Sequence, residues 1–229
     1  MRMRYKKHLP ERLEKCAEKF LARESEDFYN TPTTERDFVV DVQGAFKNNR
    51  PIILEIGCGK GAYALTCAKL HPKNNYVAVE KLSNVIVVGA ERAQAEKLDN
   101  LMFLNCSAEN LLYFLPHHCV EEIILNFSCP FPKKGYTNRR LTYKTFLEKY
   151  KLLLKPGGVI RQKTDDEQFF AFSLEQYAQN GFEVFDVTYD LHAEERENVV
   201  TEYEAKFVAL GKKICACGAR LTKNELKSE

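Results

Sequence analysis

The residues best suited to hold a ligand form a glycine-rich turn, Gly57-Cys58-Gly59-Lys60-Gly61. The apolar run Ile52 to Ile56 leads into this turn, and a polar-apolar helical pattern follows it. Glycine adopts positive φ without strain and has no Cβ, so a ligand can lie directly against the backbone where the amides of a helix start point outward. The pattern therefore predicts a strand, a turn and a helix that together bind a cofactor.

Acidic residues narrow the choice of cofactor. Glu80 ends the apolar run Tyr76 to Val79, and an acid at the end of a second strand can accept both ribose hydroxyls of an adenosine. With Ala62 in the third place, the turn also fits the looser dinucleotide fingerprint, which leaves NAD as an alternative. Glu55, two residues before the first glycine, and the loop after the fourth expected strand favour S-adenosylmethionine. The remaining alternative is a tight turn beside a solvated Glu80.

The loop after the fourth expected strand combines proline, basic and aromatic residues. It reads Ser128-Cys129-Pro130-Phe131-Pro132-Lys133-Lys134-Gly135-Tyr136-Thr137-Asn138-Arg139-Arg140. Proline stiffens the backbone, aromatic rings stack on bases, and lysine and arginine pair with phosphates. The loop therefore suits RNA with an unstacked nucleotide. A solvated basic loop is the alternative.

Composition is consistent with an RNA partner. The 229 residues are 45% hydrophobic, enough for one sizeable core, and no Pro/Gly/Ser-rich linker divides them. The net charge of the whole chain is only +2, but its charges are unevenly distributed. The segment 133–155 contains eight Lys and Arg residues and a single Glu, which indicates a polyanionic partner. Eight scattered cysteines, with no secretory or membrane-spanning pattern, predict a cytoplasmic chain with reduced thiols. Cys215 and Cys217 lack further ligands at zinc-motif spacing, so we expect no metal site.

Strand and helix patterns alternate from Pro51 onward. Strands are expected at 51–56, 76–80, 101–105, 121–127, 158–164, 182–190 and 203–210, and helices at 61–70, 83–98, 108–114, 139–154 and 166–180. This alternation predicts an α/β fold whose parallel sheet is covered by helices on both faces. Ligands of such sheets bind beyond the carboxyl ends of the strands, where the glycine turn and the basic loop both fall.

The first fifty residues are expected to form a basic N-terminal arm and a helical extension. A short amphipathic helix begins near Glu11, and a second helix is placed loosely at 34–47. The arm, Met1 to Lys7, either orders on a polyanion or is a frayed terminus. We divide the chain into this extension at 1–50, a main domain at 51–211 and a polar C-terminal tail at 212–229.

Several separated motifs make residues 51–211 resemble the bacterial tRNA (guanine-N7)-methyltransferase family. They are Glu55-Ile56-Gly57-Cys58-Gly59-Lys60-Gly61, Asn126-Phe127-Ser128, Pro130-x-Pro132-Lys133-Lys134, Arg139-Arg140-Leu141-Thr142, Lys163-Thr164-Asp165 and Thr201-Glu202-Tyr203-Glu204-x-Lys206-Phe207. The resemblance implies the Rossmann-like class I methyltransferase fold, with a seven-stranded, mostly parallel sheet and an antiparallel last strand. It also implies methyl transfer from S-adenosylmethionine to N7 of a guanine in the tRNA variable loop (position 46). The sequence leaves open whether the chain is a monomer or a homodimer.

The resemblance also implies roles for individual residues. Cofactor-binding roles fall on Glu55, Gly57, Gly59, Gly61, Glu80, Lys81, Ser107, Ala108 and Asn126. Roles around the guanine fall on Lys133, Asp165, Thr201, Glu202, Tyr203 and Glu204. Contacts to the tRNA fall on Lys134, Tyr136, Arg139 and Arg140.

The chain departs from the family where the chemistry takes place. Cys129 stands where the family usually has an aspartate regarded as catalytic, Phe131 where it has tryptophan, Gly135-Tyr136 where it has Arg-His, and Ser107 where it has an acid near the adenine. Guanine N7 attacks without losing a proton, so the enzyme mainly aligns the reactants, which contributes about 7 to 11 kcal/mol. Asp165 or Glu204 can stabilise the cationic product. We therefore expect an active but slower enzyme, with Cys129 and Asp165 as its catalytic residues.

Alternatives remain for the function. A tRNA-binding paralogue would keep the fold, the cofactor pocket and the basic loop but would have lost the reaction through Cys129 and Ser107. A third interpretation takes Ser128 to Phe131 as a variant of the turn in enzymes that methylate exocyclic amines. Cys129 itself could be a thiolate favoured by the neighbouring lysines, supplying negative charge or attacking a pyrimidine, or a small neutral side chain that fills space.

Two acidic motifs also have simple structural explanations. Asp165 or Asp166 could cap the helix that follows them. Thr201 to Glu204 could begin an alternating strand with outward acids, preceded by a polar stretch, His192 to Val200, that would suit a mobile flap.

Overall fold

The computed structural model describes residues 7–222, and these fall into two compact units, with the chain passing from the first to the second between Pro116 and His117. Most of the expected basic arm, Met1 to Lys7, and the end of the expected tail lie outside the described residues. Each unit contributes four strands, so the described residues contain eight strands where we expected seven.

The four strands of the first unit are parallel. Their order is β1 (Phe20–Arg23), β4 (Leu101–Asn105), β3 (Asn75–Val79) and β2 (Ile52–Ile56). Ile56 pairs with Val79, and Val79 pairs with Leu104, so the carboxyl ends of three strands meet at one edge. Every residue of β2 and β3 is buried, which is typical of parallel strands covered on both faces.

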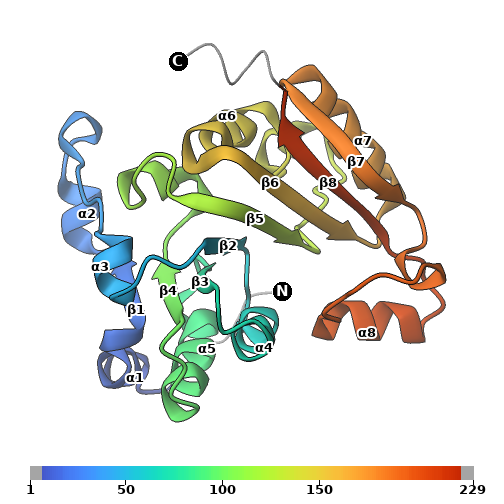
Figure 1. Ribbon diagram of the computed structural model, residues 1–229. Helices are drawn as coiled ribbons and strands as arrows, with labels where there is room; N and C mark the ends of the chain where they lie inside the picture. The colour runs from blue at the N-terminus through green and yellow to red at the C-terminus, as the bar shows by residue number, and fades with distance from the viewer. Residues whose placement is uncertain (1–6, 223–229) are drawn as a thin grey trace. The chain divides into compact units, whose positions relative to one another are not determined.

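Helices pack around these four strands (Figure 1). They are α1 (Leu9–Lys15), α2 (Glu26–Asn30), α3 (Val42–Phe46), α4 (Ala62–Leu70) and α5 (Ser83–Ala95), with short 3-10 helices η1 (Ala17–Lys19), η2 (Thr33–Glu35) and η3 (Ala108–Tyr113). Helix α4 packs on β3 and α5 on β4, while α1 packs on α5.

The expected structure of residues 1–50 is only partly right. The first amphipathic helix is present as α1, but the helix placed at 34–47 is present only over Val42–Phe46, as α3. Residues 36–41 run without helix because the amides of Phe38 and Val40 donate to the carbonyls of Tyr113 and Phe114, at 3.1 and 2.9 Å. Between these segments β1 pairs with β4 and adds the eighth strand, a pairing that no local pattern indicates.

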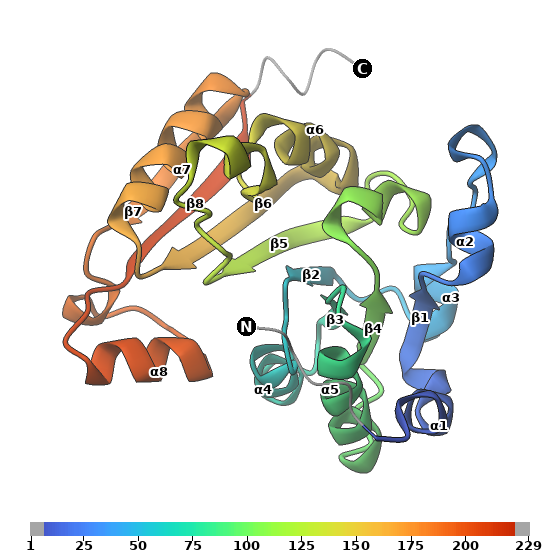
Figure 2. The ribbon, with the colours of Figure 1, turned by 180° about the vertical axis from the view of Figure 1, so that it is seen from behind.

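The second unit contains β5 (Val120–Asn126), β6 (Leu154–Thr164), β7 (Phe182–Thr188) and β8 (Cys215–Leu221). β5 and β6 are parallel, and β8 lies between β6 and β7 and runs antiparallel to both. The antiparallel direction of the last strand is therefore as expected. Figures 1 and 2 show α6 (Lys144–Leu153) and α7 (Glu167–Gln179) on one face of these strands, and α8 (Glu202–Ala209) beyond the start of β8. The 3-10 helices η4 (Lys134–Arg139) and η5 (Leu191–Ala193) complete the unit.

The expected last strand at 203–210 is wrong, because those residues form α8. The last strand is β8, inside the segment that we expected to be a polar tail from residue 212. Its sequence, Cys-Ala-Cys-Gly-Ala-Arg-Leu, has no β-branched or aromatic residue to indicate a strand. Small residues are needed there, since a Cβ at Gly218 would lie 2.5 Å from the ring of Phe185.

Candidate functional site

The glycine turn connects β2 to α4 and is tied to the end of β3. Gly57, Gly59 and Gly61 have φ of 82°, 58° and 73°, in the region that favours glycine. The amides of Gly57 and Cys58 both donate to the carbonyl oxygen of Val79, at 2.9 Å each. The turn therefore has one defined path from the buried strand to the helix, as the sequence predicted.

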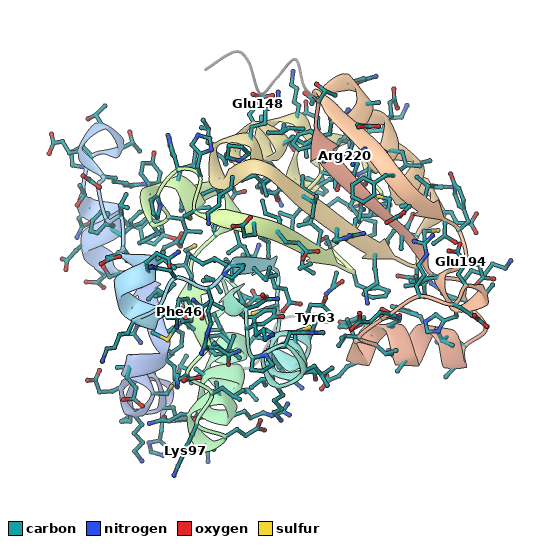
Figure 3. The ribbon with its side chains drawn as sticks, viewed as in Figure 1. Phe46, Tyr63, Lys97, Glu148, Glu194 and Arg220 are labelled. Carbon is teal, nitrogen blue, oxygen red and sulfur yellow. The ribbon has the colours of Figure 1, made fainter. Side chains whose placement is uncertain are left out.

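Two of these glycines border open space. A Cβ at Gly57 or Gly59 would meet no atom within 4 Å, whereas a Cβ at Gly61 would lie 3.1 Å from the ring of Phe103. Helix α4, whose first turn includes Tyr63 (Figure 3), starts at Gly61 without a side-chain cap. Backbone that is open to a ligand next to a helix start is the arrangement that a bound cofactor requires.

Two carboxylates give this turn a negative field. Glu55 in β2 is only 4% exposed, and Glu80 follows β3 and is half-buried. The pKa of the Cys58 thiol is raised well above its usual value by burial, and the charges of Glu55 and Glu80 raise it further. Carboxylates beside the turn suit a ligand that carries a positive charge, such as a sulfonium.

The ends of β3 and β4 are joined by side-chain hydrogen bonds. Asn105 donates through Nδ2 to the carbonyl oxygen of Glu80 (2.7 Å) and accepts at Oδ1 from the Ser83 hydroxyl (2.7 Å). The Glu80 carboxylate accepts from the Leu82 amide at 3.0 Å. Of the other residues assigned to the cofactor in this unit, Lys81 is exposed, and Ser107 and Ala108 follow β4 half-buried. The structure thus brings Glu55, the glycines, Glu80 and Ser107 to the same edge of the first unit.

In the second unit, β5 runs into the proline-containing loop through a strained turn. Phe127 follows Asn126 with φ of 50°, and Phe131 has φ of 41°, both unusual for a bulky residue. The Phe127 amide donates to the carbonyl of Lys163 at 2.8 Å. Within residues 7–222, the buried hydroxyl of Ser128 has no hydrogen-bond partner. Cys129 is exposed, so its side chain is accessible to a substrate.

The basic residues of this loop divide into two kinds. Arg140 is half-buried and donates to the carbonyls of Pro130 (2.8 Å) and Phe131 (3.3 Å). Its guanidinium also lies 4.3 Å from the ring centroid of Phe172. Arg140, which we expected to bind RNA, is therefore engaged in holding the loop. The outward-facing members are Lys133, Lys134, Tyr136 and Arg139, with the Arg139 guanidinium 4.8 Å from the Tyr136 ring centroid.

At the start of α7 the two aspartates have different contacts. Asp166 is the N-cap, and its carboxylate accepts from the Phe169 amide at 2.8 Å. Asp165 instead lies with Oδ2 2.5 Å from Nζ of Lys212. The structure therefore gives the capping role to Asp166 and an ion pair to Asp165.

Glu204 lies at the start of a helix rather than in the expected strand. Thr201 and Glu204 form a capping box at the start of α8, and the Glu204 side chain is 0% exposed. Its Oε2 accepts from Lys163 Nζ at 2.7 Å, and its Oε1 lies 2.9 Å from His192 Nε2 and 2.6 Å from Asn198 Nδ2. Burial acts to raise the pKa of Glu204, but hydrogen bonds from Lys163 and Asn198 outweigh it and lower that pKa. The carboxylate holds the segment 191–201, which includes Glu194 (Figure 3).

Two aromatic rings of α8 pack against Phe127, which follows β5. Phe127 stacks on Tyr203 and Phe207, with centroid distances of 6.4 and 6.2 Å and interplanar angles of 23° and 28°. Lys212 Nζ lies 4.5 Å from the Phe207 ring centroid. Tyr203 is 62% exposed, so its ring can take a further stacking partner.

Comparison with known proteins identifies the family. Residues 49–217 match the sequence profile of a protein family described as "Putative methyltransferase". The tRNA (guanine-N(7)-)-methyltransferase of Brevibacillus brevis is 42% identical over 171 residues, which cover 74% of this chain and 80% of that protein. Its counterpart from Alkaliphilus oremlandii is 43% identical over 177 residues, covering 77% and 84%. The chain belongs to the tRNA (guanine-N7)-methyltransferase family.

Solved structures confirm the fold expected for this family. The antibiotic-resistance methyltransferase Kmr aligns with a TM-score of 0.56 at 16% identity, over 78% of this chain and 90% of its own. The 16S rRNA methyltransferase KamB aligns with a TM-score of 0.59 at 18% identity, over 75% and 88%. The expected class I methyltransferase fold is therefore right, apart from the additional strand.

Other features of this family member are structural. All eight cysteines lie in the described part of the chain and none forms a disulfide. Cys215 and Cys217 are buried in β8, and burial raises their pKa to about 11 and about 12. No group of three or more His, Cys, Asp or Glu side chains in residues 7–222 is arranged to hold a metal. Among the helices in that range, none combines the length and apolar character needed to cross a membrane.

Sequence reasoning missed two features of the site. The Thr201-x-x-Glu204 spacing is a capping-box signature and could have revealed α8. The second feature is the contact of Glu24 with the loop after β4, which no local sequence pattern indicates. The Glu24 carboxylate accepts from the Ser107 amide at 2.8 Å, although the two residues are 83 positions apart.

Proposed function

We propose that this chain transfers a methyl group from S-adenosylmethionine to N7 of a guanine in the variable loop of tRNA. The observation that carries the proposal is the open glycine turn in the negative field of Glu55 and Glu80. Such a site suits a nucleoside that carries a positive sulfonium. The names of relatives at 42% and 43% identity support tRNA as the substrate class. Those names give no support to a non-catalytic paralogue.

The first unit would bind the methyl donor. Gly57 and Gly59 would hold it against the backbone, Gly61 would let the start of α4 pack beside Phe103, and Glu80 would accept the ribose hydroxyls. Ser107 and Ala108 would border the adenine, with Lys81 nearby. When bound, the donor supplies an electrophilic methyl group on a positively charged sulfur.

The second unit would orient the guanine. N7 attacks with its own lone pair, so these residues need to align the base and stabilise positive charge without removing a proton. Asp165 is the carboxylate that we assign to this task, and it must exchange its ion pair with Lys212 for the base. Lys133 and Cys129 would flank the same base from the loop. The exposed ring of Tyr203 would stack on the guanine or on its neighbour.

The tRNA backbone would bind to the outward-facing part of the loop. Lys134 and Arg139 are exposed beside Tyr136, which suits phosphates next to a stacked base. Thr201, Glu202 and Glu204 would act through α8: Thr201 and Glu204 fix its start, and Glu202 remains exposed.

The test is a methylation assay with radiolabelled S-adenosylmethionine and unmodified tRNA, followed by digestion to nucleosides. We expect the label in N7-methylguanosine, and loss of labelling with a tRNA whose variable-loop guanine is replaced by adenine. Label on the exocyclic amine of adenine, or protein that binds tRNA without labelling it, would overturn the proposal.

A further inference from the structure

The N-terminal segment, residues 20–40, encloses the loop that follows β4. Strand β1 pairs with β4 as far as Arg23 opposite Asn105. Further along, Phe28 of α2 stacks on Phe114, with ring centroids 5.0 Å apart and planes at 26°. The loop between Asn105 and Phe114 is therefore held at both ends by the same N-terminal segment. Figure 1 shows β1 beside β4, with α2 following it.

Between these two contacts, Glu24 reaches the loop directly. Its amide donates to the Asn105 carbonyl at 2.9 Å. Its Oε1 accepts from the amide of Ser107 at 2.8 Å and from Nδ2 of Asn110 at 2.7 Å. Its Oε2 accepts from the Tyr29 hydroxyl. One half-buried carboxylate thus receives three donors, two of them from the loop, and hydrogen bonds to a charged acceptor are the stronger kind.

The loop held by Glu24 lies at the ligand-binding edge of the first unit. Asn105 links β4 to the carbonyl of Glu80, and Ser107 follows two residues later. Glu24, Asn105 and Glu80 therefore form one continuous set of hydrogen bonds from the N-terminal segment to the residue proposed to bind the ribose.

We propose that Glu24 is a positioning residue for the methyl donor. By holding the Ser107 amide and Asn110, it fixes the loop 106–110 in the orientation that borders the adenine. This inference rests on the proposed function, because it assigns the ligand at this edge. The inference goes further in making the N-terminal segment part of the cofactor site, because Glu24 in that segment positions the loop.

The role of Glu24 is separable from folding of the segment. Phe28 and Phe38 anchor the segment through their contacts with the ring of Phe114, with centroids 5.0 and 6.1 Å apart. None of these contacts involves the Glu24 carboxylate. Removing that carboxylate should therefore loosen the loop while β1 and α2 stay in place.

The experiment is calorimetric titration of the full chain and its variants with S-adenosylhomocysteine. Glu24→Ala should raise the dissociation constant about tenfold. Glu24→Gln keeps an oxygen that can accept from Ser107 and should raise it no more than about threefold. Glu24→Asp keeps the charge but is one methylene shorter, so it should behave more like Glu24→Ala. Glu26→Gln, at a neighbouring exposed acid, is the matched control and should bind normally.

Each result decides between explanations. Equal affinity of Glu24→Ala and the wild type would overturn the inference, as would normal binding by Glu24→Asp with impaired Glu24→Gln, since charge rather than position would then matter. Wild-type protein that fails to bind S-adenosylhomocysteine would instead overturn the proposed function. Melting curves without ligand, similar for all variants, establish that the affinity change is local. Turnover at saturating methyl donor and KM for tRNA should stay close to wild type, which a general loss of structure would not allow.

Discussion

Lys163 Nζ lies 2.7 Å from Oε2 of Glu204, and the Glu204 side chain is fully buried. Lys163 is itself only 11% exposed and also donates to Asn198 Oδ1 and the Val199 carbonyl, both at 3.0 Å. This pair fastens the segment before α8 to β6. Removing one partner of a buried ion pair leaves the other charge without compensation, which costs about 3 to 5 kcal/mol. We therefore expect Glu204→Ala to lose that much stability in urea unfolding, and Glu202→Gln, at the exposed neighbour, to lose almost none.

The same carboxylate predicts a dependence of stability on pH. Folding lowers the pKa of Glu204 below its ordinary value of 4.5. The ionised carboxylate therefore contributes fully to the free energy of unfolding above pH 4.5, and this contribution is lost as the pH falls through the pKa of the folded state. Melting temperatures measured from pH 7 to pH 3 should fall below about pH 4.5. The fall should be shallower in Glu204→Gln, which has no carboxylate to protonate, although Lys163 and His192 still face the site. Parallel curves for the two proteins would contradict this account.

Gly59 should be sensitive to an added methyl group for two separable reasons. Alanine at its φ of 58° costs about 1 to 2 kcal/mol of backbone strain. The new Cβ would also project into the open space where the cofactor is proposed to lie. Gly157→Ala is the matched control, since Gly157 has φ of 83° and equally open surroundings in β6. We expect both variants to lose similar stability, but only Gly59→Ala to bind S-adenosylhomocysteine more than tenfold more weakly. Equal affinity of the two variants for S-adenosylhomocysteine would show that the glycine turn does not contact the cofactor.

Cys129 is exposed at the position proposed to face the guanine. A carboxylate there would stabilise the positive charge that develops on the alkylated purine. Cys129→Asp should therefore raise turnover about tenfold, equivalent to about 1.4 kcal/mol of barrier. Cys129→Asn, which has similar size and no charge, should stay near wild type in the same assay. An unchanged rate in the aspartate variant would mean that this side chain takes no part in the reaction.

The two kinds of arginine in the basic loop should differ in their salt dependence. Arg139 is exposed, so Arg139→Ala should weaken tRNA binding and reduce the slope of log affinity against log salt by about 1, and Lys134→Ala should do the same. Arg140 binds the carbonyls of Pro130 and Phe131, so Arg140→Ala should lower kcat/KM with little change in slope. Arg140→Lys should not restore activity, because lysine lacks the planar fork. Filter binding at several salt concentrations would measure the slopes, and the methylation assay would measure kcat/KM. A reduced slope for Arg140→Ala would show that Arg140 binds phosphate.

The sequence alone predicted features that depend on local pattern. The apolar runs before Gly57 and before Glu80 specify buried strands, since a parallel strand covered on both faces needs apolar residues throughout. The glycine turn specifies its own backbone, because positive φ at 57, 59 and 61 is costly for other residues. Capping by Asp166 was likewise open to prediction from its place before a helical pattern.

The tertiary structure decided what depends on partners distant in sequence. Strand β8 consists mostly of small residues, and it forms a strand because its backbone pairs with β6 on one side and β7 on the other. The ring of Phe185 also fills the place that a Cβ at position 218 would occupy. Arg140 and Glu204 carry charges that suggest contact with a substrate, yet Arg140 lies over the ring of Phe172 and Glu204 accepts from Lys163, partners that only the fold brings near. Glu24 meets Ser107 across 83 positions for the same reason. Local sequence determines the backbone that a residue can adopt, whereas the use of a charged side chain depends on which donors and acceptors the folded chain places within its reach.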